Sequence, residues 1–152
     1  MKKLLLVLCL ALAPAVAGAD ELDKYMEMMR TDLRAAKVEL LTDELKMTDP
    51  QAAIFWPIQR EYEVELAKVQ DARYAMIKDY AKAYSVMDDA TAKSLMDRAF
   101  KLQEQRTALL KKYSGKVSKQ VSPQVGARFA QVEAFVQSMI DLKLRGEVPV
   151  MQ

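Results

Sequence analysis

Apolar residues recur at intervals of three and four along almost the whole chain, and this is the period of an α-helix. Glycine and proline rarely interrupt the pattern, because the 152 residues include only 4 glycines and 5 prolines. No stretch alternates apolar and polar residues over the roughly four to eight positions that a half-buried strand needs. The sequence therefore predicts an all-α protein.

Four helices are expected, separated by short breaks. They span about residues 21–46, 49–84, 89–119 and 123–145. Each of the last three follows an apolar residue and a good N-cap, namely Met47-Thr48, Met87-Asp88 and Val121-Ser122. Such a cap accepts a hydrogen bond from a free main-chain N–H of the first turn, while the apolar residue packs back on that turn.

Two residues are expected to disturb the long middle helices. Pro57 removes a main-chain hydrogen bond inside the second helix, which predicts a kink or a restart there. Gly115 weakens the third helix near its end, so an early end with a short turn beyond it is also expected.

Length decides the predicted architecture. A helix of about 36 residues extends ~54 Å, whereas a compact domain of this size has a radius of gyration of ~14 Å. We therefore expect residues 20–152 to form a single domain, built on an elongated antiparallel hairpin of the middle helices with the outer helices packed across it. Because such a hairpin leaves apolar area uncovered, the sequence also favours a homodimer.

Residues 47–62 and 121–136 show a faint similarity at an offset of 74 positions. The matching pairs are Thr48 and Ser122, Ala53 and Ala127, Phe55 and Phe129, and Ile58 and Val132. These matches are too few to establish an internal repeat.

Residues 1–19 have the three-part layout of a secretory signal peptide. Lys2 and Lys3 precede an apolar run from Leu4 to Ala13, and small residues continue to Ala19. The apolar run has about half of the ~20 residues that a membrane span needs. We therefore predict cleavage near Ala19, a periplasmic location and no stable insertion in a membrane.

Cleavage at Ala19 would leave little catalytic chemistry in the mature chain. It would remove Cys9, the single cysteine, and the sequence contains no histidine. Most nucleophilic catalysts and transition-metal sites depend on thiol or imidazole groups, and no glycine-rich phosphate loop is present either. The sequence predicts a protein that is not an enzyme and needs no cofactor or metal.

Charge is balanced overall but divided along the chain. Lys2 and Lys3 account for the net charge of +2, so residues 20–152 are neutral and a general affinity for nucleic acid is not expected. Residues 20–66 carry 12 acidic and 6 basic residues, whereas residues 67–152 carry 9 acidic and 15 basic ones. This division either guides the docking of helices, protomers or partners, or forms two solvated faces that partly neutralise each other.

The strongly basic third helix supplies candidate contacts for a protein partner. The candidates are Arg98, Lys101, Arg106, Lys111 and Lys112, together with Met26 and Met29 of the first helix. Long cationic side chains cover apolar surface with their methylene groups, and thioethers adapt to varied partners. The alternative for the cations is ion pairing with the acidic first and second helices, and for the methionines it is a place in the core.

Several motifs resemble those of a known family. Met47-Thr48-Asp49-Pro50-Gln51 resembles the L-T-x-x-Q signature of the Spy/CpxP-like periplasmic proteins, with Met in place of Leu. A branch of small exported bacterial proteins shares F-W-P-x-x-x-E-Y and a later A-R-F-x-Q-x-E. The residues that match this branch are Phe55, Trp56, Pro57, Glu61, Tyr62, Arg128, Phe129 and Gln131.

The resemblance implies a helical envelope-stress protein that acts as a chaperone without ATP. Its partners would be unfolded or partly folded envelope proteins. The alternative is an adaptor that docks on one envelope protein, or a purely structural dimer.

Overall fold

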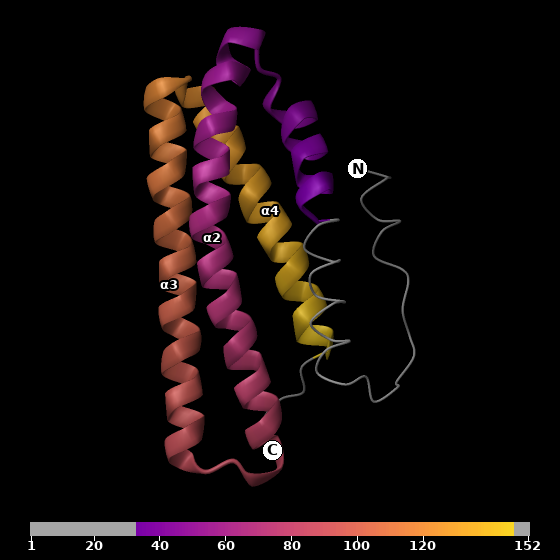
Figure 1. The fold of residues 1–152 in the computed structure, drawn as a ribbon, viewed down its shortest axis with the longest axis vertical. Coiled ribbons are helices and arrows are strands. Elements are labelled where there is room, and N and C mark those ends of the chain that lie inside the picture. The colour runs from indigo at the N-terminus through magenta and orange to yellow at the C-terminus, as the bar shows by residue number, and fades with distance from the viewer. Residues whose placement is uncertain (1–32, 148–152) are drawn as a thin grey trace. The chain divides into compact units, whose positions relative to one another are not determined.

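The computed structural model of the protein describes the backbone of residues 33–147 and the side chains of residues 33–142. The predicted signal peptide and residues 21–32, with Met26 and Met29, lie outside the described residues. Within the described range the chain is all-α, with four helices and no strand, as predicted. They are a helix over residues 33–45, then α2 (Asp49–Ala83), α3 (Asp89–Gln120) and α4 (Pro123–Glu147), with the 3-10 turn η1 (Tyr84–Val86) after α2 (Figure 1).

The chain divides into two compact units, Met1–Glu44 and Leu45–Gln152. In the first unit, the helix that starts at residue 33 carries a hydrogen bond from Thr42 Oγ1 to the carbonyl oxygen of Val38 at 2.8 Å. The helix ends at Leu45, directly before Lys46, whose φ of 47° places it in the left-handed region. A left-handed residue after the last turn is a common helix stop, usually made by glycine.

The three helices of the second unit begin at the predicted N-caps. Thr91 N–H donates to Asp88 Oδ1 at 2.7 Å, and Val125 N–H donates to Ser122 Oγ at 3.1 Å. At the start of α2, the N–H of Thr48 donates to Gln51 Oε1 at 3.0 Å, which is one half of the predicted capping box. The hydrogen bond from Thr91 also holds the pKa of the Asp88 carboxyl below its usual value. These caps fix where each helix starts.

Pro57 and Gly115 do not divide their helices. Of the predicted kink or restart at Pro57, the restart does not occur, because α2 runs without a break from Asp49 to Ala83. The predicted early end at Gly115 is also wrong, because α3 continues to Gln120. Buried side chains flank both positions: Phe55 and Ile58 beside Pro57, and Tyr113 and Val117 beside Gly115. Packing of these residues outweighs the local cost of a proline or glycine in a helix.

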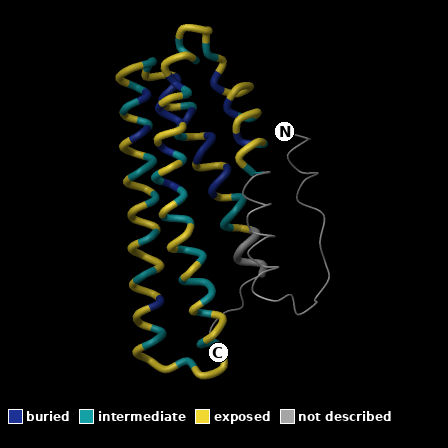
Figure 2. The backbone as a smooth tube through the Cα atoms, in the orientation of Figure 1, coloured by how far each residue is buried: buried dark blue, intermediate teal, exposed yellow. Residues whose placement is uncertain are grey.

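In the second unit, α2 and α3 form a long antiparallel hairpin and α4 packs on it (Figure 1). Buried residues gather near the turn between α3 and α4 (Figure 2). Aromatic rings pack edge to face there. The ring of Tyr62 lies 5.5 Å from that of Tyr113 and 5.4 Å from that of Phe129, and Phe55 lies 5.6 Å from Phe129. Phe55 and Phe129, which match at the offset of 74 positions, therefore pack on each other.

Helices α3 and α4 approach closely at Gly126. A Cβ atom there would lie 2.8 Å from both the carbonyl oxygen of Ser114 and the main-chain nitrogen of Ser118, and closer still to Ser118 Oγ. Real Cβ atoms essentially never come within 3.0 Å of such groups. Gly126 therefore allows a contact between α3 and α4 that any larger residue would push apart.

Candidate protein-binding surface

The two halves of the α2–α3 hairpin differ in burial. The proximal half comprises residues 49–66 and 111–120, beside the turn between α3 and α4, and the distal half comprises residues 67–83 and 89–110. Leu95 is the one buried side chain in the described distal half, whereas buried residues recur along the proximal half (Figure 2). The proximal half also carries the packed rings of Tyr62 and Tyr113. Figure 1 shows why, since α4 diverges from α3 toward its C-terminal end.

Met96 and Phe100 form an exposed apolar face on the distal half of α3. Their exposed fractions are 49% and 63%, which are high for large apolar side chains. They lie one helical turn apart. Met96 lies 18 residues before Ser114, and Phe100 lies 18 residues before Ser118, which is about five full turns in each case. Because Ser114 and Ser118 face Gly126 of α4, Met96 and Phe100 lie on the side of α3 that α4 covers only proximally.

An ion cluster ties α4 to both helices of the hairpin. Arg106 donates to both carboxylate oxygens of Asp141, at 3.0 and 2.9 Å, and Arg73 donates to Asp141 Oδ1 at 2.6 Å. Partial burial raises the pKa of the Asp141 carboxyl, but the hydrogen bonds from Arg106 and Arg73 outweigh this effect and lower it overall. Arg106 is only 14% exposed, so this predicted partner contact is used inside the protein.

Other basic residues of α3 pair with acidic residues of α2. Arg98 binds Asp79 at 2.8 Å and Lys112 binds Glu65 at 3.0 Å. Hydrogen bonds from Lys112 and Tyr113 lower the pKa of the Glu65 carboxyl. The alternative of ion pairing thus describes Arg98 and Lys112, and Lys116 pairs with Glu61 in the same way. Such exposed pairs contribute little to stability, because solvent screens their charges.

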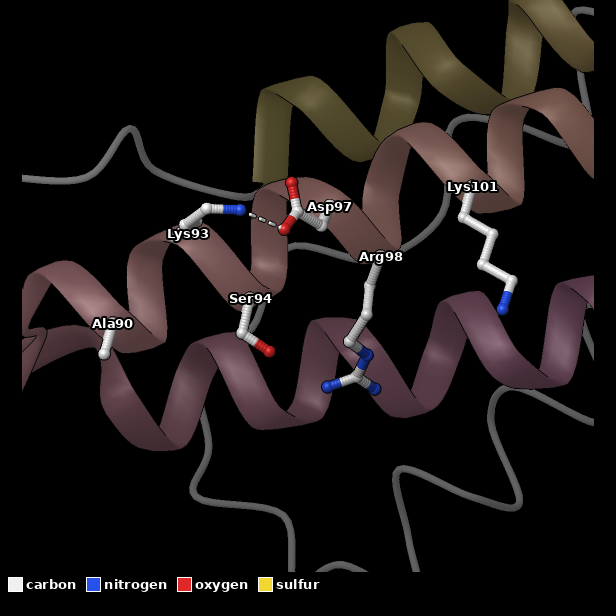
Figure 3. A pocket seen from close by; sticks show the side chains of 6 residues that line it. All are labelled: Ala90, Lys93, Ser94, Asp97, Arg98 and Lys101. Carbon is white, nitrogen blue, oxygen red and sulfur yellow. Dashed lines mark hydrogen bonds and ion pairs between the residues drawn. The ribbon is translucent and has the colours of Figure 1, made fainter.

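Lys101 and Lys111 are the predicted contact residues that form no ion pair in the part of the chain that the structure describes. Both side chains are exposed. Figure 3 shows Lys101 and Arg98 pointing from α3 toward α2 at an open hollow, which Ala90, Lys93, Ser94 and Asp97 also line. The hollow is open to solvent on one side, and Lys93 and Asp97 bind each other across 2.6 Å at its edge.

The residues of the family-like motifs are mainly caps, core and helix contacts. Phe55, Tyr62 and Phe129 are buried, and Trp56 is half-buried with its ring 5.1 Å from that of Phe55. Arg128 donates to the carbonyl oxygen of Leu45 at 3.1 Å. The remaining members are the cap residues Thr48 and Gln51, the ion-paired Glu61, the half-buried Met47, and the exposed Pro57 and Gln131. These residues therefore determine where the helices start and how they pack. None of them belongs to the Met96–Phe100 face.

Polar residues inside the three-helix packing were not predicted from the sequence. The hydroxyl of Tyr62 donates to Glu133 Oε2 at 3.1 Å with both side chains fully buried, and Arg106 donates to Gln137 Oε1 at 3.2 Å. Burial, together with the charge and hydrogen bond of Glu133, raises the pKa of the Tyr62 hydroxyl. The available signal was the spacing of Glu133, Gln137 and Asp141 at four-residue intervals beside the apolar stripe of α4.

A comparison with protein-family models, curated proteins and solved structures finds no match to this chain. The resemblance to the Spy/CpxP-like proteins therefore stays a prediction. No group of acidic side chains in residues 33–142 is arranged to hold a metal ion, and no described helix is long and apolar enough to cross a membrane.

Proposed function

We propose that the mature chain is an exported, non-enzymatic protein that binds exposed apolar segments of unfolded or partly folded envelope proteins without ATP. The observation that carries this proposal is the exposed face of Met96 and Phe100 on the distal half of α3. Contiguous apolar side chains exposed on a soluble protein mark a candidate interaction site, whereas single exposed apolar residues are ordinary.

The surroundings of this face support a preference for segments that combine apolar and acidic residues. Lys93 lies within one turn of Met96 on α3, whereas Lys101 points toward α2 (Figure 3). Lys93 is 71% exposed even though it pairs with Asp97. Thioether and lysine side chains are flexible, so one face can fit segments of different shape.

The test is light scattering of a chemically denatured client protein diluted into buffer with purified residues 20–152. We expect suppression of aggregation at a several-fold molar excess, and loss of most of it in Phe100→Ser. The matched control is Val86→Ser, which removes an apolar side chain that is 77% exposed at the tip of the hairpin. Equal suppression by Phe100→Ser and the wild type, or none by either, would reject the proposal.

A photo-crosslinking residue placed at position 96 separates this function from that of an adaptor. Many weakly crosslinked envelope proteins are expected for a chaperone, whereas a single stoichiometric product would indicate an adaptor. Amino-terminal sequencing of the exported protein checks the location, and a start at Asp20 is expected.

A further inference from the structure

We infer that Met96 is an oxidation site, at which a peroxide converts the thioether to a sulfoxide and so lowers the binding of apolar segments to the Met96–Phe100 face. The inference rests on the proposed function, because it concerns the regulation of the same face. The modification is reversible, since reduction of the sulfoxide restores the apolar side chain.

Met96 differs from the other described methionines in its exposure. Among the methionines of residues 33–142, Met96 is the exposed one, with an exposed fraction of 49%. The others are half-buried, namely Met47, Met76, Met87 and Met139. Oxidation of methionine follows access of the oxidant to the sulfur. Met96 is therefore expected to react before the others of this range.

The composition of the predicted mature chain directs an oxidant to methionine. Cys9 is the single cysteine of the sequence, and the predicted cleavage near Ala19 removes it. Cysteine thiolates are the side chains that otherwise consume peroxides. After cleavage no thiol of residues 20–152 competes with the Met96 thioether.

The oxidation transfers one oxygen atom and two electrons. The sulfur lone pair of Met96 attacks one oxygen of hydrogen peroxide, an S–O bond forms and the O–O bond breaks. The other oxygen leaves as water with both protons, so the sulfur is oxidised and the peroxide is reduced. In the reverse reaction, a methionine sulfoxide reductase takes two electrons from a dithiol, the oxygen leaves as water and the dithiol becomes a disulfide.

The surroundings of Met96 make the sulfoxide important for binding rather than for folding. Its neighbours one turn away on α3 include the exposed Ala99 and Phe100. Lys93, which also lies one turn away, pairs with Asp97. An apolar segment that covers this face would bury the sulfoxide oxygen without a hydrogen-bond partner, which is unfavourable. In the free protein the exposed sulfoxide stays hydrated, so the fold is retained.

Peptide mapping of residues 20–152 after limited exposure to hydrogen peroxide tests the site. Cleavage after lysine and arginine leaves Met96 as the single methionine of the peptide 94–98, and Met139 as the single methionine of the peptide 129–143. The sulfoxide should form about threefold faster or more at Met96 than at Met139. An equal or slower rate at Met96 would overturn the inference.

Binding of a fluorescent apolar dye tests the consequence. Oxidation of the wild type should lower dye binding about twofold or more, and methionine sulfoxide reductases should restore it. Met96→Leu keeps an apolar side chain of similar volume, so it should bind dye before and after exposure to peroxide. Met96→Gln makes the position polar and should bind weakly without peroxide. The matched control is Met76→Leu, which replaces a half-buried methionine of the distal half and should stay as sensitive to peroxide as the wild type.

The aggregation assay separates this inference from the proposed function. If the reduced and the oxidised wild type suppress aggregation equally, the inference fails and the proposed function stands. If neither suppresses aggregation but Met96→Leu protects dye binding from peroxide, the proposed function fails and the oxidation site stands. A loss of dye binding on oxidation that is the same in Met96→Leu and the wild type would also overturn the inference. Far-UV circular dichroism melts confirm that each protein is folded before and after oxidation.

Discussion

The proximal and distal halves of the α2–α3 hairpin are made from the same two helices, yet only one half is a core. In the proximal half, the ring of Tyr62 of α2 packs edge to face on Tyr113 of α3 and on Phe129 of α4. In the distal half the helices are held by Leu95 and by exposed ion pairs such as Arg98 with Asp79. A third helix, rather than the hairpin itself, therefore determines which half of the hairpin is buried and which is exposed.

The course of α4 creates this difference. Gly126 lets α4 approach α3 closely at one end, and Asp141 binds Arg73 and Arg106 close to the middle of the hairpin. Figure 1 shows α4 slanting away from α3 toward its C-terminal end. Stability should therefore respond strongly to changes before Asp141, and binding to changes on the uncovered part of α3.

The largest loss of stability is expected from Phe129→Ala. Phe129 is fully buried between Phe55 and Tyr62, so its removal leaves a cavity and should lower the free energy of unfolding by about 4 kcal/mol. The control is Phe135→Ala on the same helix, where a side chain that is 46% exposed should cost less than about 1.5 kcal/mol. Urea unfolding followed by circular dichroism measures both. Equal losses would show that the core does not lie where the packing places it.

Gly115 of α3 and Gly126 of α4 provide the next test, because the same substitution should change stability in opposite directions at the two positions. Gly126→Ala forces α3 and α4 apart and should destabilise the protein by about 2 kcal/mol. Gly115→Ala should stabilise it by about 0.5–1 kcal/mol, since a Cβ there meets no atom within 4 Å and alanine favours the helix. Chemical unfolding of both variants provides the measurement. A stabilising Gly126→Ala would contradict the close approach of the helices.

A smaller and pH-dependent loss is expected from Asp141→Asn. Removing the charge weakens its hydrogen bonds with Arg73 and Arg106 and should cost about 1.5 kcal/mol at pH 7. Because the folded-state pKa of Asp141 is lowered, its stabilising effect is complete above the unfolded pKa of about 3.9 and is lost as the pH falls through the folded pKa. The difference between wild type and Asp141→Asn should therefore shrink below about pH 4. A difference that stays constant from pH 7 to pH 2.5 would argue against the ion cluster.

Short-range sequence rules predicted the helices, whereas the ion cluster and the exposed apolar face depend on which helices contact each other. Thr48, Asp88 and Ser122 were identifiable because a cap is satisfied within its own first turn. The restart at Pro57 was mispredicted because its local cost had to be weighed against the burial of neighbouring side chains of the same helix.

The candidate site was less predictable for the same physical reason. Arg106 was predicted to contact a protein partner. In the structure it forms an ion pair with Asp141, which lies 35 positions away on another helix. No rule of sequence spacing predicts that pairing. Phe100 lies on a different side of α3 from the buried Leu95, Tyr113 and Val117. Its exposure follows from the divergence of α4, which no local pattern encodes.

The smallest effect on stability is expected where the effect on binding is largest. Phe100 is 63% exposed, so Phe100→Ser should change the free energy of unfolding by less than about 1 kcal/mol. The same substitution removes the largest apolar side chain from the Met96–Phe100 face, so binding of a fluorescent apolar dye should fall at least twofold. Measuring unfolding and dye binding on one preparation provides its own control, because a protein that had lost its fold would bind more dye. A large destabilisation would mean that the distal half is part of the core and that its apolar face is needed for folding. The same side chain cannot be a major packing residue and a free binding surface at once.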